Sequence, residues 1–304
     1  MENRFIRFFK RNLQAVDIFL ISILLFYSLL AGISYPRVKG GMMVVLGNLG
    51  IAIIFLASIL FYRKTSSQKG RFWLRISSVS LVLFYIYEVS LRLVHVFTPT
   101  WKDAAIVRLE QAVFGVQPTL WLQKFISPGL TEWMMFTYLF YFALYPILGA
   151  NLFFRRSEAH MEDFLFTVAT NNVLCNVGYF LYPVANPMFQ LGRLYSVPLK
   201  GYVFTSIGEF MRAHLMSIGG AMPSGHAAAA TIIGLMAYRY HRPTFWFLAP
   251  VVISIYISSV YCRFHYLSDI ILGIFIGLFV WWTIPFLKKR LGLNPMQAEP
   301  RRLH

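Results

Sequence analysis

The chain has 304 residues, of which 58% are hydrophobic and 13% are charged, and its mean hydropathy is +0.59. A soluble domain carries about 25% charged residues, so this composition predicts an integral membrane protein. The net charge of +16 does not indicate a nucleic-acid partner, because the basic residues lie between apolar runs and no nucleic-acid-binding motif is present.

Eight apolar runs are long enough to cross a bilayer, which takes roughly 17 to 25 residues. They cover about 17–34, 42–62, 73–95, 131–154, 161–183, 224–240, 244–262 and 266–287. The basic segment before the first run is expected to be retained in the cytoplasm and not cleaved as a signal. An even number of spans places both termini on one side. The excess of Lys and Arg in the segments on that side predicts that it is the cytoplasm.

Two more polar stretches separate these runs. Residues 96–130 predict an amphipathic helix in the outer membrane interface, and residues 184–222 predict a loop or re-entrant piece that caps a site. There is no repeat or linker, so we expect a single membrane domain. Its parts are N-terminal helices (1–95), an interfacial segment (96–130), a catalytic core (131–287) and a cytoplasmic tail (288–304). The cysteines, Cys175 and Cys262, predict neither a disulfide framework nor a cysteine-based metal site.

Two histidines stand at the mouths of apolar runs. His265 and Asp269, in "HYLSD", are one helical turn apart and therefore share a face. A carboxylate there can accept the imidazole N–H and leave the other ring nitrogen free as a nucleophile. The alternative interpretation is an interfacial His and Asp that only end a helix near water. Gly273 and Gly277 continue the same face, and small residues let helices approach closely.

The other histidine, His226, belongs to the sequence "PSGH". Ser224 can cap the helix that follows, and the first turn of that helix then presents backbone N–H groups that attract an anion such as phosphate. Gly225 allows close approach, and His226 can donate a proton to a leaving oxygen. His226, Ala230 and Gly234 form a small-residue face that we expect to pack against the His265 face or a shared neighbour. With both termini in the cytoplasm, the two histidines lie at the outer face.

The pair "PSGH" and "HYLSD" resembles the second and third signature motifs of the type 2 phosphatidic acid phosphatase superfamily, over residues 160–285. The resemblance implies an all-α membrane protein with about eight transmembrane helices, a six-helix core and an interfacial helix. It implies metal-independent chemistry on lipid phosphates and no cofactor. It further implies that His265 forms a phosphohistidine, Asp269 orients it, His226 is the general acid, and Ser224 and Gly225 hold phosphate.

The first motif of the phosphatases, Lys-x6-Arg-Pro, is missing. The corresponding region reads "LYPVANPMF", and Ser259 stands where the third motif usually has Arg. Arg263 is the nearest base that can substitute. A phosphomonoester carries close to two negative charges and a phosphodiester one, so losing bases favours a phosphodiester. The chain therefore resembles the branch of inositol phosphorylceramide synthase and sphingomyelin synthase, which transfers a phospho-headgroup to an alcohol.

Three further residues are candidates for substrate binding. Arg92 follows Glu88 by one turn, so it either forms a structural ion pair or reaches the phosphate. Arg212 precedes the "PSGH" turn and either touches a headgroup or lines a wet loop. Asn186 occupies the place of the lost first motif and can donate a hydrogen bond to substrate.

The expected function is therefore transfer of a phospho-headgroup between lipids in the bilayer. Hydrolysis of a lipid phosphate or polyprenyl pyrophosphate by the same residues is the close alternative. A metal site built from the two histidines and the aspartate, and a non-catalytic lipid binder or transporter, are alternatives of other classes. The lipid and the oligomeric state do not follow from the sequence.

Overall fold

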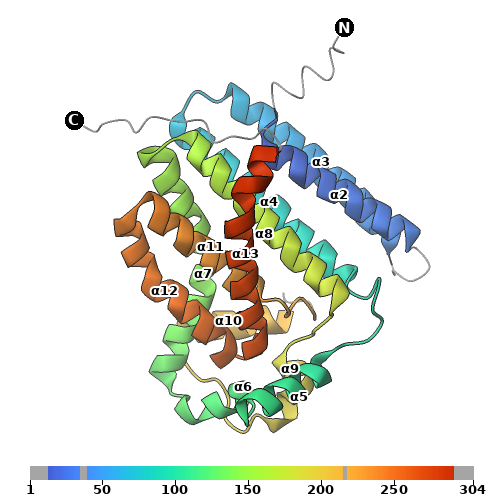
Figure 1. Ribbon diagram of the computed structural model, residues 1–304, viewed down its shortest axis with the longest axis vertical. Helices are drawn as coiled ribbons and strands as arrows, with labels where there is room; N and C mark the ends of the chain where they lie inside the picture. Colours follow the sequence, from blue (N-terminus) through green and yellow to red (C-terminus); the bar gives the residue numbers. More distant parts are fainter. Residues whose placement is uncertain (1–12, 35–39, 215–217, 291–304) are drawn as a thin grey trace.

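The computed structural model describes residues 13–34, 40–214 and 218–290, and within those ranges the chain is helical, with no strand (Figure 1). The long helices are α2 (Ala15–Ile33), α3 (Gly41–Lys64), α4 (Gln68–Arg92), α7 (Pro128–Arg155), α8 (Glu158–Leu181), α11 (Gly225–Tyr240), α12 (Arg242–Tyr261) and α13 (Leu267–Arg290). Their bounds agree closely with the eight predicted runs.

Within the described ranges, seven of these helices are long and apolar enough to cross a membrane, all except α11. The 16 residues of α11 extend roughly 24 Å, less than the hydrocarbon thickness of about 30 Å. The eighth expected span is therefore a shorter helix, and it packs against α13, α12, α8 and α7. Apolar side chains cover the outside of the long helices, such as Met43 and Phe61 of α3, as expected of a surface that faces lipid.

Six long helices, α4, α7, α8, α11, α12 and α13, make up the core, while α2 and α3 pack against each other at one side (Figure 1). α2 also contacts α4 and α8. The first turn of α2 and the last turn of α13 lie at the same end of the bundle. We call this the charged end, and the opposite end, where α11 and α13 begin, the histidine end.

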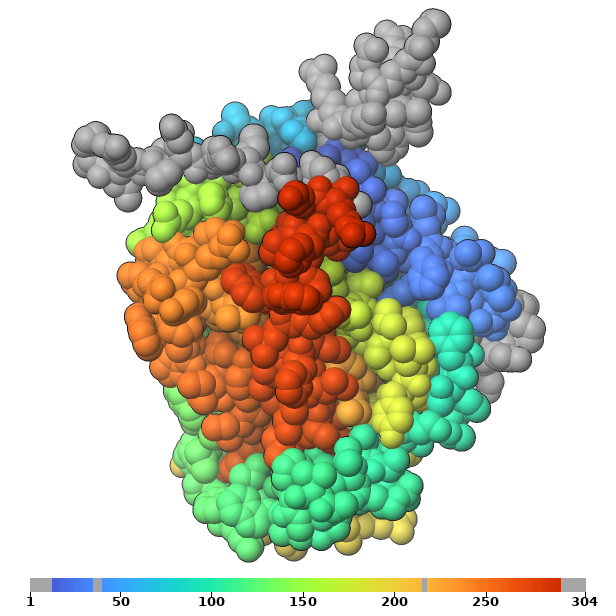
Figure 2. Space-filling view, viewed as in Figure 1, coloured from blue at the N-terminus to red at the C-terminus, as the bar shows by residue number. Residues whose placement is uncertain are grey.

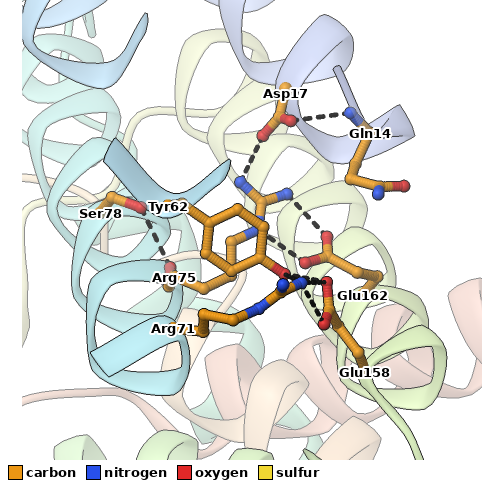
Figure 3. A network of polar contacts seen from close by, with 8 residues as sticks. All are labelled: Gln14, Asp17, Tyr62, Arg71, Arg75, Ser78, Glu158 and Glu162. Carbon is orange, nitrogen blue, oxygen red and sulfur yellow. Dashed lines mark hydrogen bonds and ion pairs between the residues drawn. The ribbon is translucent and has the colours of Figure 1, made fainter. Parts of the chain in front are cut away.

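The charged end is held by buried ion pairs. Arg75 of α4 is 2% exposed and bonds Asp17 of α2 at 2.6 Å and Glu162 of α8 at 2.6 Å (Figure 3). One turn earlier on α4, Arg71 contacts Glu158 of α8 at 2.5 Å. These pairs join α2, α4 and α8, because a buried guanidinium needs a carboxylate from a neighbouring helix to compensate its lost hydration.

Glycines bring α13 against α11. A Cβ added to Gly273 would lie 2.5 Å from the Ser224 carbonyl oxygen, and one added to Gly277 would lie 2.7 Å from the Ala228 carbonyl oxygen. The predicted close approach of α13 is thus confirmed. For the predicted face of α11 the shared-neighbour alternative holds at Gly234, which faces Val252 of α12, a helix that contacts both α11 and α13. The side of α11 that contacts α13 is the one that carries Ser224 and Ala228.

The two polar stretches both cover the histidine end. Residues 96–130 contain α5 (Asp103–Phe114), α6 (Pro118–Trp121) and η1 (Leu122–Phe125). Residues 184–222 contain α9 (Pro187–Leu191), η2 (Gly192–Leu194) and α10 (Val203–His214), so this stretch is more helical than a simple loop. Glu132 of α7 fixes the start of α10 by accepting the backbone N–H of Tyr202 and of Phe204, each at 2.7 Å. The predicted N-terminal and C-terminal cytoplasmic segments lie largely outside the described residues.

Candidate active site

The two histidines meet at the histidine end. His226 lies in the first turn of α11, and His265 lies two residues before α13 begins. Their ring centroids are 5.8 Å apart, in an edge-to-face arrangement. His265 is 5% exposed. The close packing of α11 on α13 places the two imidazoles where one small group can touch both.

A backbone carbonyl, and not Asp269, orients the His265 ring. The His265 Nδ1 lies 2.9 Å from the Ala221 oxygen but 3.6 Å from the nearer Asp269 oxygen. A carbonyl oxygen only accepts, so Nδ1 carries the proton and Nε2 has a free lone pair. The expectation that Asp269 accepts this N–H is corrected, because 3.6 Å exceeds hydrogen-bond distance. The carboxylate remains close enough to stabilise a positive charge on the ring.

Asp269 is completely buried and organises the backbone around His265. Its Oδ2 accepts the backbone N–H of Tyr266 at 2.8 Å, and its own carbonyl accepts the N–H of Ser224 at 2.9 Å. The second bond ties the "PSGH" turn directly to the "HYLSD" turn. The other carboxylate oxygen, Oδ1, is buried and has no hydrogen-bond partner among the described residues.

The "PSGH" turn has the predicted cap. The Ser224 hydroxyl accepts the backbone N–H of Ala227 at 3.3 Å, and Ser224 is fully buried. A Cβ added to Gly225 would lie 3.0 Å from the Tyr179 hydroxyl, which is tighter than an ordinary contact. A side chain at position 225 would therefore push against α8.

His226 is enclosed by aromatic rings of α7. It stacks on Tyr138 with centroids 4.5 Å apart and an interplanar angle of 22°, and it lies 4.3 Å from the Tyr141 ring. The His226 Nε2 is buried, and within the described part of the chain no group bonds it. A buried ring nitrogen without a partner is costly in a folded protein, so His226 Nε2 is a candidate to bond a ligand or an ordered water.

A ladder of rings leads from this histidine to a guanidinium. Tyr138 stacks on Phe264 with centroids 4.0 Å apart and an angle of 9°. The Arg212 guanidinium lies over the Phe264 ring, 4.1 Å from its centroid. Arg212, on α10, also donates to the Cys262 carbonyl oxygen at 2.5 Å and pairs with Glu209 at 3.4 Å. Arg212 is thereby fixed at the far end of the stack that runs from His226 through Tyr138 and Phe264.

Arg263 is the second base near the site, and it is 6% exposed. Its guanidinium donates to the Val197 carbonyl oxygen and lies 4.0 Å over the Tyr195 ring. Burial lowers the pKa of Arg263, and the charge of Arg212 lowers it further. The Nε groups of both arginines are buried and have no partner among the residues described. Two neighbouring guanidiniums with unused donors form an arrangement that an anion would stabilise.

The structure gives Asn186 and Arg92 other positions. The Asn186 side-chain oxygen accepts the backbone N–H of Phe189 at 3.1 Å and so caps α9. Arg92 is exposed at the last turn of α4. Neither side chain is brought to the histidine pair by a contact in the described structure. Asn at a helix start is a common cap, and this local role competes with substrate binding.

Several residues of the site could not be identified from the sequence. The Ala221 carbonyl is a backbone group, and Tyr138 lies in an apolar run in which aromatic residues are frequent. Asp103 and Glu110 are fully buried acids of α5 that bond the residues around His265. Their spacing of seven, with an apolar residue between them, is the one pattern that could have indicated a shared inward face.

The residues at the histidine end do not form a metal site of the usual kind. Within the described ranges, no group of three or more His, Cys, Asp or Glu side chains is arranged to hold a metal ion. The metal-site alternative built on His226, His265 and Asp269 therefore gains no support.

Comparison with known proteins identifies the family of the chain. The family model described as the PAP2 superfamily matches residues 104–283, which include most of α5, both histidine turns and most of α13. The chain belongs to the PAP2 superfamily. It is an integral membrane protein of that superfamily, with His226 and His265 inside the matched region.

Individual relatives are more distant. A PA-phosphatase related-family protein of Dictyostelium discoideum is 29% identical over 107 residues, which is 33% of this chain and 19% of that protein. A bacitracin transport permease protein, BcrC, of Bacillus licheniformis is 31% identical over 83 residues, which is 25% of this chain and 41% of that protein. The chain thus matches less than half the length of either relative.

One solved structure is also similar, a transmembrane PAP2-type phosphatidylglycerolphosphate phosphatase from Bacillus subtilis. It is 19% identical, and the alignment covers 69% of this chain and 96% of that one, with a TM-score of 0.36.

Proposed function

We propose that the chain is a lipid phosphotransferase that moves a phospho-headgroup from a phospholipid to an alcohol through a phosphohistidine. The observation that supports this most is the pairing of His265 with His226 at 5.8 Å. The nucleophile has its Nδ1 fixed by the Ala221 carbonyl, and the acid has a buried nitrogen without a partner within the described chain. These are the two groups that nucleophilic catalysis at phosphorus needs.

The reaction has two balanced steps. In the first, His265 Nε2 attacks phosphorus, the bond from phosphorus to the lipid alcohol oxygen breaks, and His226 gives that oxygen a proton. In the second, the acceptor hydroxyl attacks the phosphohistidine, His226 takes the hydroxyl proton, and the phosphorus–nitrogen bond breaks. Asp269, 3.6 Å from His265 Nδ1, stabilises the positive charge on the ring in both steps. No metal ion takes part, so activity survives chelation of divalent cations.

The phosphate lies between the histidines and the two arginines. Arg212 and Arg263 direct their unused Nε donors to its oxygens, while Ser224 and Gly225 hold the α11 turn close. Glu209 offsets the charge of Arg212. Arg212, Arg263 and Glu209 together therefore carry one net positive charge. A phosphodiester carries one negative charge, and a phosphomonoester carries nearly two. This balance favours a phosphodiester donor. The proposed phosphate site does not include Asn186 or Arg92.

We also propose an orientation and an organisation for the chain. Basic residues gather at the charged end, including Arg71, Arg75 and Lys288, and basic flanks face the cytoplasm in membrane proteins. Both termini are then cytoplasmic in a bacterial cytoplasmic membrane, and the histidines act on the extracytoplasmic leaflet. The chain forms one membrane domain.

Product analysis separates transfer from the alternatives. Purified protein is incubated in mixed micelles with phosphatidic acid, phosphatidylinositol or phosphatidylglycerol as labelled donor, with and without diacylglycerol or ceramide as acceptor. Mass spectrometry then identifies the products. With phosphatidylinositol or phosphatidylglycerol as donor, we expect diacylglycerol and a new phosphodiester lipid that forms only when acceptor is present. Diacylglycerol with inorganic phosphate from phosphatidic acid, or with water-soluble headgroup phosphate from the other two donors, and no new lipid, would establish hydrolysis. Binding of donor without any product would support a non-catalytic lipid binder.

A further inference from the structure

The interfacial helix α5 turns two acids toward the bundle. Asp103 is 1% exposed and Glu110 is 0% exposed, and between them Ile106 is buried as well. Leu109 and Val113, next to this buried face, are 48% and 63% exposed, and Arg108 on the opposite face is exposed as well. The two acids are thus turned away from solvent and lipid, although they are the acidic residues of the helix. Figure 2 shows the α5–α6 segment covering the end of the bundle at which α13 begins.

Asp103 bonds the residue that follows the proposed nucleophile. Its Oδ1 accepts the hydroxyl of Tyr266 at 3.0 Å. Tyr266 is completely buried, and its backbone N–H donates to Asp269. Asp103 is therefore linked through one side chain to the backbone between His265 and Asp269.

A series of hydrogen bonds also links Asp103 to the carbonyl that orients His265. Its Oδ2 accepts the backbone N–H of Ala185 at 2.8 Å. The neighbouring Val184 carbonyl accepts the N–H of Ala221 at 3.2 Å, and the Ala221 carbonyl in turn accepts from His265. Val184, Ala221 and Tyr266 form one buried cluster with Ile106 of α5. Asp103 thus reaches the His265 region by two independent routes.

Glu110 bonds the other side of the same turn. Its Oε1 accepts both the backbone N–H of Ser268, at 2.8 Å, and the Ser268 hydroxyl, at 2.9 Å. Ser268 directly precedes Asp269 in the first turn of α13. Burial raises the pKa of both Asp103 and Glu110 above their ordinary values, so each carboxylate loses hydration to make these bonds.

We infer that Asp103 and Glu110 are positioning residues, which hold His265 and Asp269 in the geometry needed to attack phosphorus. Neither acid touches the histidine pair in the structure. They act through Tyr266, Ala221 and Ser268. This inference depends on the proposed function, because it takes His265 as the nucleophile. It gives α5, which lies outside the core bundle, a role in positioning the nucleophile.

Asp103 and Glu110 differ in how their carboxylate oxygens accept hydrogen bonds. We therefore expect substitution by the matching amide to affect activity differently at the two positions. Asp103 accepts three donors, from Tyr266, Ala185 and Asn186, with both of its oxygens. Asp103→Asn turns one oxygen into an NH₂ group that faces a donor, so the arrangement is lost. Glu110 uses one oxygen for both donors, and its Oε2 has no partner in the described structure. Glu110→Gln can keep both bonds, whereas Glu110→Ala removes them.

The experiment compares kcat and KM of Asp103→Asn, Glu110→Ala and Glu110→Gln, using the donor that the wild-type protein turns over fastest. We expect kcat to fall by roughly 10- to 100-fold in the first two variants, because a misplacement of about 1 Å costs that much. The donor KM should change little, and Glu110→Gln should keep wild-type kcat. Because the first two variants also leave buried donors without partners, their melting temperatures should fall, so kcat is expressed per folded molecule. Arg108→Ala, on the exposed side of α5, is the matched control.

A second measurement does not need turnover. Orthovanadate, a phosphate mimic that accepts an imidazole nitrogen, is titrated calorimetrically into each variant. Asp103→Asn and Glu110→Ala should weaken binding, and Arg108→Ala should not. The positioning role is wrong if both variants keep wild-type kcat and vanadate affinity, or lose activity only in proportion to unfolded protein. His265→Ala separates the two hypotheses, because activity that survives in that variant contradicts the proposed function itself.

Discussion

The two ends of the bundle both bury charged groups, but they differ in how those groups are satisfied. At the charged end, Arg75 bonds two carboxylates, and Lys288 bonds Asp163 and the Thr167 hydroxyl. At the histidine end, several buried atoms of ionisable side chains have no hydrogen-bond partner among the described residues. They include His226 Nε2, Asp269 Oδ1, Arg212 Nε, Arg263 Nε and Glu110 Oε2.

This difference distinguishes polar groups that hold the helices together from polar groups that are available to a substrate. A buried polar group that lacks a partner costs stability, so the ionisable atoms without partners at the histidine end are candidates to bond a ligand or an ordered water. A buried pair that is fully bonded holds helices together and offers nothing to a substrate. We therefore expect mutations at the histidine end to reduce activity and mutations at the charged end to reduce stability.

The largest effect is expected from His265→Asn. Loss of the attacking nitrogen should reduce turnover at least about 10⁴-fold. The melting temperature in detergent should stay near that of the wild type, since the Asn amide nitrogen, bonded to Cγ as Nδ1 is, can donate to the Ala221 carbonyl. The measurement is initial rate together with thermal unfolding. A variant that unfolds as strongly as it loses activity would contradict the division between the two ends.

The next largest effect is expected from Arg75→Met. Removing the guanidinium leaves Asp17 and Glu162 buried without their partner, which should cost about 3–5 kcal/mol of unfolding free energy. Activity per folded molecule should be unchanged, because the ion pairs are at the end opposite the histidines. Denaturant unfolding in detergent measures the loss.

A triple variant provides the control for this prediction. Asp17→Leu, Arg75→Met and Glu162→Leu together replace the charged group by apolar side chains of similar size. Stability should return toward that of the wild type, because no buried charge is left without a partner. If the triple variant is as unstable as Arg75→Met alone, the interaction is more specific than charge compensation.

The sequence predicted the helices and the histidine pair well, because both depend on local patterns. Apolar runs set the span bounds, and motif spacing placed His226 and His265 at the starts of two adjacent helices. It could not predict the orientation of His265, since that depends on the Ala221 carbonyl, 44 residues away in the chain. Backbone atoms leave no trace in residue identity, and their positions come only from tertiary packing.

The charged end shows a second reason for failure. Asp17 and Arg75 are 58 residues apart, and Arg75 and Glu162 are 87 apart, so no local pattern connects them. In the sequence, basic residues near span ends indicate only the orientation of the chain in the membrane. The direction of the Arg263 side chain was equally beyond the sequence, because it follows from a positive φ of 63° and from contacts with the 195–197 segment.

A smaller effect is expected from Arg212→Ala. The guanidinium stacks on Phe264 and offers an unused donor near the histidines, so its loss should raise the donor KM more than it lowers kcat. We expect roughly a 10- to 100-fold change in kcat/KM, the value of one or two charge-assisted hydrogen bonds. Arg212→Lys should recover little, since an ammonium lacks the planar fork. Steady-state kinetics with the phospholipid donor varied gives both constants, and an unchanged KM would remove Arg212 from the phosphate site.

The smallest effect concerns two serine caps at opposite ends of the bundle. Ser224 caps α11 at the histidine end, and Ser157 caps α8 at the charged end by accepting the His160 backbone N–H at 3.4 Å. Replacing either with Ala should cost about 1 kcal/mol of unfolding free energy. Only Ser224→Ala should also weaken orthovanadate binding, because Ser224 lies in the turn that is proposed to hold phosphate.

The paired caps make this small difference measurable. Both variants remove one hydroxyl that bonds a backbone N–H in the first turn of a long helix, and the Ser157 hydroxyl also lies 2.7 Å from His160 Nδ1. The loss of unfolding free energy is therefore measured for each variant and set against its vanadate affinity. Any remaining loss of vanadate affinity in Ser224→Ala then reports on the ligand and not on the helix. Equal vanadate affinities in the two variants would limit Ser224 to capping and leave the arginines and the histidine pair to bind the phosphate.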